Sequence, residues 1–325
     1  MISSNLSARF RIATRDEVWV VEDGRIQVIQ SRLAHGEADF DGAVVHARDR
    51  AHDPLLSACE GKFERDAAHL RDVVVGCPGL SVRIAVSVRE ASGVQRDETI
   101  VECSIGGLSV ITTPAYAASD VAALLSYARL TRTAVAPDNA PIVWCQGTSA
   151  VLLHEAAGHA SESGSAPMTW PAWLRVVDAP LIAVDDLGAK TKTVDLLRGE
   201  TPSSSRRETF RDLALARMSR VVVSQVDAPP IHAIERIEVH LIAGGSYDPL
   251  TGQVSVQVTV ARACALDGSA VWLRPFALRR SRLEIAQAIR GASGQPVRYP
   301  GVICSREGQD VYVESHGCDL LTVFE

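Results

Sequence analysis

Short runs rich in β-branched residues follow one another through the second half of the chain, each bounded by Gly, Pro or Asp. Such runs favour strands, and short polar connections favour antiparallel neighbours. We expect two helices among them, over 150–162 and 281–290, and hydroxyls at Thr148 and Ser149 to cap the first. The expected strands lie at 142–144, 181–184, 194–197, 219–226, 234–242, 254–261, 271–273, 310–313 and 320–323, with a Gly/Pro-rich loop at 291–301. This half is therefore expected to be largely antiparallel sheet.

The first half mixes strands and helices. The dipeptide Asp23-Gly24 favours a type I′ turn, so residues 17–30 are expected to form a β-hairpin. Further segments have helical or alternating periodicity: helices at 59–75 and 119–132, strands at 80–89 and 98–110. A stretch rich in Pro, Asn and Asp over 133–142 is typical of a domain boundary. We therefore expect an α+β protein with an N-terminal mixed α/β domain (1–138) and a C-terminal, largely antiparallel β domain (139–325) that carries the 150–162 helix.

Composition excludes several classes of protein. A chain of 325 residues with 46% hydrophobic residues can bury sizeable cores, and a formal charge of −6 without a basic cluster argues against nucleic-acid binding. The N-terminus has no uninterrupted apolar segment and no stretch is long enough to cross a bilayer, so a cytoplasmic protein with no membrane contact is expected. Seven cysteines without a CxxC pair argue against a disulfide framework.

The most informative segment is His154-Glu155-Ala156-Ala157-Gly158-His159. In the common HExxH zinc helix the two imidazoles are four residues apart and face one ion. Here they are five apart, which in a regular α-helix places them roughly 140° apart around the axis. A π-type turn at Ala157-Gly158 would accommodate the extra residue, and such turns occur mostly at functional sites. The alternative interpretation is that His154 and His159 are two histidines of one helix that bind no common ion.

The surrounding sequence resembles the TldD/PmbA family of zinc metallopeptidases, whose catalytic subunits carry HExxxH. The apolar residues 151–153 before the motif and Glu162 after it belong to this resemblance. Three further segments resemble the family in the same order along the chain: 205–210 with 216–219, the Gly-rich 244–253, and 300–309 around Cys304. The resemblance covers roughly residues 140–325, because the N-terminal half matches only loosely.

The resemblance implies a zinc ion held by His154, His159 and Cys304, with Glu155 as the catalytic acid/base. Such a His₂Cys set leaves a fourth position for water, as catalytic zinc sites require. The implied reaction is hydrolysis of amide bonds in short or unfolded peptides. The family also implies a dimer, either of two copies or with a TldE/PmbA-like paralogue.

Other residues are candidates for a role at the site, and each also has an ordinary structural explanation. Glu162 could orient His159 or be a solvated helix-end residue. Arg206 and Arg207 could bind a substrate carboxylate or form surface ion pairs. The Gly244-Gly245 pair could line a channel in which an extended peptide adds to a sheet edge, or could belong to a plain hairpin. His316 and Cys318 are interpreted as structural, although a local role stays open.

Two departures from the family pattern leave alternatives open. The N-terminal half is shorter than in a typical member, and the segment between Val194 and Ser205 is trimmed. A specialised zinc enzyme, acting on one modified peptide or small amide or by non-hydrolytic chemistry, is therefore an alternative. A non-catalytic partner subunit is the second alternative, against which the presence of all four site residues argues.

Overall fold

The computed structural model describes residues 9–39, 53–91, 93–165, 168–206, 215–306 and 309–324. Fifteen of the described strands form one sheet, ordered β14-β13-β12-β6-β17-β16-β5-β4-β3-β1-β2 with β7, β8, β11 and β15 attached beside this path. Its pairs are antiparallel except β11–β17 and β12–β6. The α+β character and the antiparallel bias are therefore confirmed, whereas the division at residue 138 stays a prediction.

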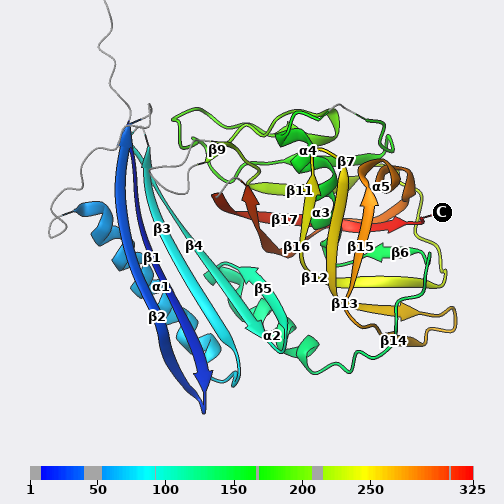
Figure 1. The fold of residues 1–325 in the computed structure, drawn as a ribbon, viewed down its shortest axis with the longest axis horizontal. Coiled ribbons are helices and arrows are strands. Elements are labelled where there is room, and N and C mark those ends of the chain that lie inside the picture. The colour runs from blue at the N-terminus through cyan, green and yellow to red at the C-terminus, as the bar shows by residue number, and fades with distance from the viewer. Residues whose placement is uncertain are drawn as a thin grey trace, which may run out of the picture.

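The N-terminal half is a layer of long strands with α1 (Pro54–Val74) against one face (Figure 1). Its strands are β1 (Arg9–Glu22), β2 (Arg25–Asp39), β3 (Ser81–Ala91), β4 (Val94–Ile105) and β5 (Leu108–Thr112). Asp23 and Gly24 have positive φ angles of 47° and 70°, as the predicted hairpin turn requires. The α1 helix begins five residues before the predicted start, because Asp53 caps it by accepting a hydrogen bond from Leu55 N at 2.8 Å.

The second predicted helix of this half is α2 (Ala117–Ala128), after a 3₁₀ turn at Pro114–Tyr116. The chain then enters β6 (Ile142–Trp144), which lies between β12 and β17 and leads directly into the HExxxH segment. The two halves of the sheet join where β5 pairs with β16 at Ile111 and Gly301. No described helix is both long and apolar enough to cross a membrane.

The C-terminal half contains strands of very different lengths. The short strands are β7 (Leu174–Asp178), β8 (Val194–Asp195), β9 (Ser205–Arg206), β10 (Leu215–Ala216), β11 (Arg220–Gln225), β14 (Ala270–Trp272) and β15 (Phe276–Ser281). The long strands are β12 (Arg236–Asp248), β13 (Gln253–Cys264), β16 (Ile289–Arg306) and β17 (Gln309–Thr322). A 3₁₀ turn follows β8 at Leu196–Arg198, and α5 (Arg282–Ala288) begins at a Ser281/Glu284 capping box, close to its predicted start.

Several expectations for this half are wrong. Residues 310–313 and 320–322, expected in two separate strands, both belong to β17, and residues 196–197 form the 3₁₀ turn after β8. Residues 291–301 are not a loop but part of β16, because register shifts within the β16–β17 pair, one of them between Ser293 and Val297, absorb the glycines and prolines. Residues 181–184 form only a bridge at Val184, since the Asp185 carboxylate organises a turn by accepting backbone hydrogen bonds. Residues 244–248 belong to β12, so the Gly-rich loop is reduced to the tight turn ending at Gly252.

Candidate metal centre

The HExxxH segment begins at a glycine that the packing requires. Gly147 has a φ of 83°, and a Cβ there would lie 2.6 Å from Val297 O. Helix α3 (Thr148–Leu153) starts after it, with all six residues buried. The hydroxyls predicted to cap this helix do not cap it, because Thr148 donates to Cys145 O and Ser149 to Cys318 O. They tie the start of α3 to the residue that follows β6 and to β17 instead.

The predicted π turn is confirmed. Residues His154–Gly158 form a π-helix, closed by a hydrogen bond from His159 N to His154 O, and α4 (His159–Glu162) follows. Side chains bind the carbonyls inside this wider turn: Arg282 Nε donates to Ala156 O at 2.8 Å, and Ser161 Oγ to Ala157 O at 3.0 Å. Gly158 is needed, since a Cβ there would lie 2.1 Å from Met218 Sδ.

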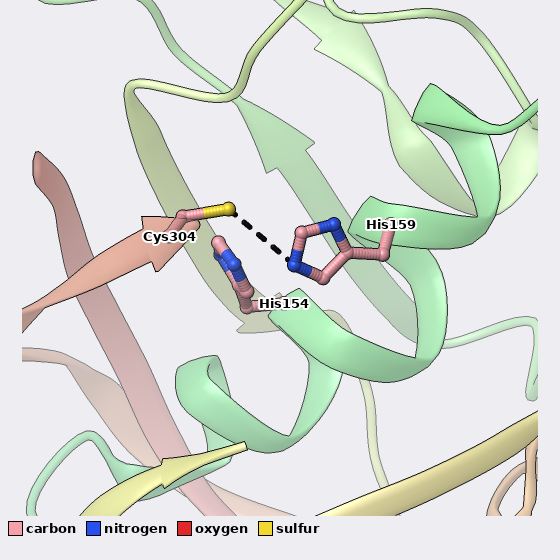
Figure 2. Close-up of side chains that lie close together, drawn as sticks. All are labelled: His154, His159 and Cys304. Atoms are coloured by element: carbon pink, nitrogen blue, oxygen red, sulfur yellow. Dashed lines mark hydrogen bonds between the residues drawn. The ribbon is translucent and has the colours of Figure 1, made fainter. Parts of the chain in front are cut away.

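The π turn brings both imidazoles to the same place, where β16 supplies Cys304 (Figure 2). One ligand atom from each of His154, His159 and Cys304 lies within 4.8 Å of the other two. The two rings meet edge to face with centroids 4.8 Å apart, and Cys304 Sγ is 3.4 Å from His159 Nε2. The structure thus brings together the three predicted ligands as a group that could hold a metal ion.

The donor set fits a zinc ion. His154 is 1% exposed, and neither of its ring nitrogens has a hydrogen-bond partner among the described residues. Burial lowers the pKa of His154 well below its ordinary value, and the charges of His159 and Arg217 lower it further. A neutral imidazole with an unused lone pair is the form that binds metal, and one thiolate with two imidazoles suits zinc.

Glu155 lies beside this group. Its side chain is buried, and Oε2 lies 3.6 Å from His159 Nε2 and has no hydrogen-bond partner among the described residues. Burial raises the pKa of Glu155 to about 7, although the charge of His159 opposes the shift. A carboxyl with such a pKa can both take and give a proton near neutral pH.

The predicted contact between Glu162 and His159 is present. Glu162 is not a solvated helix-end residue, because its side chain is fully buried and Oε2 lies 2.9 Å from His159 Nδ1. Its other oxygen accepts a hydrogen bond from Met218 N at 3.0 Å. Burial lowers the pKa of His159, but hydrogen bonds with Cys304 and Glu162 outweigh burial and raise it. Glu162 therefore fixes the orientation of this ring, leaving Nε2 toward Cys304.

A cavity of about 400 Å³ opens onto the group. Its walls come from the HExxxH segment, the end of β12 and the end of β16: Glu155, His159, Ser163, Gly245, Ser246, Tyr247, Pro249, Ile303, Cys304, Ser305 and Arg306. Gly245 lines the cavity, as predicted, but its neighbour Gly244 does not line it. A Cβ at Gly245 would lie 2.6 Å from Glu155 Cγ, so this glycine makes room for the carboxylate.

The structure does not test Arg206 and Arg207, and it places His316 and Cys318 outside the metal-capable group. Arg206 ends β9 and its side chain is not described, and Arg207 lies outside the described residues. His316 Nε2 contacts Glu314 Oε1 at 2.5 Å, and Cys318 is buried in the core, so neither belongs to the metal-capable group.

Sequence reasoning missed two arginines that support the site. Arg282 binds the π turn, and the fully buried Arg217 donates a hydrogen bond to Cys304 Sγ at 3.0 Å. Arg217 stands in the segment that resembles the family, which was its only signal. Nothing in the sequence around Arg282 indicated its contact.

No known protein family and no curated protein matches the sequence of this chain. Among solved structures, eight chains match, and one of them is TldE from Thermococcus kodakarensis. The match covers 98% of this chain and 96% of that chain with a TM-score of 0.53 at 11% sequence identity. At this identity the similarity concerns the fold alone. The chain therefore has a TldE-like fold along almost its whole length.

Proposed function

We propose that the protein is a zinc-dependent metallopeptidase that hydrolyses amide bonds in short or unfolded peptides. The observation that carries this proposal is the convergence of His154, His159 and Cys304 beside the buried Glu155, at the wall of a cavity. The TldE-like fold agrees with the family resemblance in the sequence, from which the peptidase activity is inferred. The three ligands would hold the ion and leave room for water.

When bound, zinc would polarise the substrate carbonyl and acidify a water molecule. The chain's own residues would then move the proton. Glu155 Oε2 has no other hydrogen-bond partner among the described residues, so it is available to accept the proton of the attacking water. It would then donate this proton to the leaving amine nitrogen. A pKa near 7 allows Glu155 both to accept and to donate the proton.

The surroundings would keep these groups in place. Glu162 holds His159 through Nδ1, so the ring presents Nε2 to the ion. Gly245 contributes no side chain, so the β12 backbone closes over Glu155 without displacing it. Tyr247 contacts Ser165 at 3.0 Å and forms part of the same cavity wall.

The test combines metal analysis with catalysis. Purified protein should contain one zinc ion per chain and cleave unstructured peptides, while Glu155→Gln should keep the zinc and lose about 10²–10⁴-fold in kcat. Loss of zinc in this variant would make Glu155 a ligand, and retained turnover would remove its catalytic role. The assay should include any TldE/PmbA-like partner encoded nearby.

A specialised enzyme acting on one small amide or modified peptide is the second candidate. The observation that favours it is the size of the cavity, since about 400 Å³ suits a small molecule as well as a few peptide residues. If zinc-loaded protein with its partner cuts no unstructured peptide, this candidate replaces the general peptidase. A chain that binds no metal would instead indicate the non-catalytic subunit.

A further inference from the structure

Arg217 is a fully buried cation next to a proposed cation site. Its side chain is 0% exposed, and a guanidinium is rarely buried unless charged or polar acceptors surround it. Nη2 donates to Cys304 Sγ at 3.0 Å and also to Cys304 O, while Nε lies 3.7 Å from Glu162 Oε1. One planar group thus contacts both the thiol and the backbone of the predicted sulfur ligand.

These contacts close a ring around the site. Glu162 links Arg217 to His159, whose Nε2 lies 3.4 Å from Cys304 Sγ. Arg217 therefore connects the two ligands that come from different elements, α4 and β16, which are 145 residues apart in the sequence. A flexible ammonium could not match this arrangement, because only a guanidinium presents several N–H groups in a fixed fork.

The position of this charge has a chemical consequence. Hydrogen bonds to a ligating sulfur withdraw electron density from it, which is how proteins tune metal–thiolate centres. A purely structural cation would not need to donate to the sulfur itself.

We propose that Arg217 is a positioning residue of the metal centre, which fixes the Cys304 thiolate through an N–H···S hydrogen bond and weakens its electron donation to the ion. This inference rests on the proposed metal site, not on peptide cleavage. Weaker donation leaves the ion a stronger Lewis acid while Cys304 still anchors it. The mechanism thereby gains a role for a residue outside the HExxxH motif.

Cobalt-substituted protein tests the inference, because Co²⁺ shows a thiolate-to-metal charge-transfer band. The band must disappear in Cys304→Ser. In Arg217→Met it should move to longer wavelength, and competition with a chelator should show about 10–100-fold weaker metal binding. Arg217→Lys should move the band less, since it keeps the charge without the fork. Arg262→Met is the matched control: it removes an ion-paired arginine that contacts Glu238 and none of the three ligands, so its band should stay at the wild-type wavelength.

An unshifted band in Arg217→Met, or in Arg217→Lys if only that variant folds, overturns the inference. An equal shift in Arg262→Met also overturns it, because the shift would then not depend on the N–H···S bond. Should neither arginine variant fold, wild-type protein loaded with NMR-active cadmium replaces them: a coupling between a guanidinium proton and the metal supports the bond, and its absence refutes it. Protein that binds cobalt but cleaves no peptide would refute only the peptidase.

Discussion

Replacing Gly245 with Ala should lower kcat by displacing the side chain of Glu155, without affecting the metal ligands. The added Cβ would lie 2.6 Å from Glu155 Cγ and 2.8 Å from Oε1. Non-bonded carbons prefer about 3.5 Å, so the carboxylate must move by about 0.9 Å, the difference of the two. A displacement of about 1 Å in a reacting group can cost 10²-fold. We therefore expect kcat to fall about 100-fold with zinc still bound.

The kinetic assay uses an unstructured peptide and separates kcat from KM. If Gly245 instead only borders a substrate channel, the Ala side chain would raise KM and leave kcat nearly unchanged. Gly61→Ala is the matched control, because its Cβ would meet only Arg65 Nη1, at 3.5 Å, in helix α1. That variant should keep wild-type activity and show whether a Gly-to-Ala change as such affects the protein.

A double variant makes the reasoning refutable. If Gly245→Ala acts by displacing Glu155, adding it to Glu155→Gln should cost almost nothing further, because the two changes remove the same function. Independent, additive losses would show that Gly245 serves another purpose. Wild-type kcat in zinc-loaded Gly245→Ala would refute the geometric argument itself.

Four further outcomes follow from the same geometry. Cys304→Ser should lose most of its zinc by metal analysis, and full occupancy would contradict the ligand assignment. Gly158→Ala should lower the free energy of unfolding by about 1–3 kcal/mol in denaturant titration, because its Cβ would lie 2.1 Å from Met218 Sδ. Zinc affinity should fall as pH falls, since the raised pKa of His159 means that the ion must displace a proton there; an affinity independent of pH would contradict this. Light scattering should give the mass of a dimer, because β2 is the terminal strand of the described sheet path and Val28, Ile29 and Leu33 are exposed on it, whereas an active monomer would argue against pairing.

Local patterns gave reliable predictions where the cause is local. The spacing of His154 and His159 required an extra residue in one helical turn, and the π turn is present there. The Asp23-Gly24 turn, the helix near 59–75 and the helix after Ser281 follow from backbone preference and capping, which act within a few residues. The hairpin turn and the helix starts depend on no distant partner, whereas the π turn is also bound by Arg282, 126 residues from Ala156 in the sequence.

Predictions failed where hydrogen bonding to another strand decided the conformation. Gly and Pro residues over 291–301 indicated a loop, yet β17 pairs with this segment across several bulges and makes it the middle of β16. The same reason extends β12 through Gly245. Pairing with a neighbouring strand supplies backbone hydrogen bonds to the whole segment. This stabilisation outweighs the weak preference of single Gly and Pro residues for loops.

The chemistry of the site divides in the same way. The HExxxH letters carry the two imidazoles and Glu155, because those residues are neighbours in the chain. The distances that matter are long-range: β16 brings Cys304 to within 3.4 Å of His159, and β12 places Gly245 against Glu155. Arg217 is buried against that sulfur because its own segment packs against β16, which carries Cys304, and α4, which carries Glu162. Contacts between segments so far apart produce no periodicity or spacing in the sequence. Only packing of the whole sheet around α3 could place these groups, since burial and proximity are properties of the assembled core.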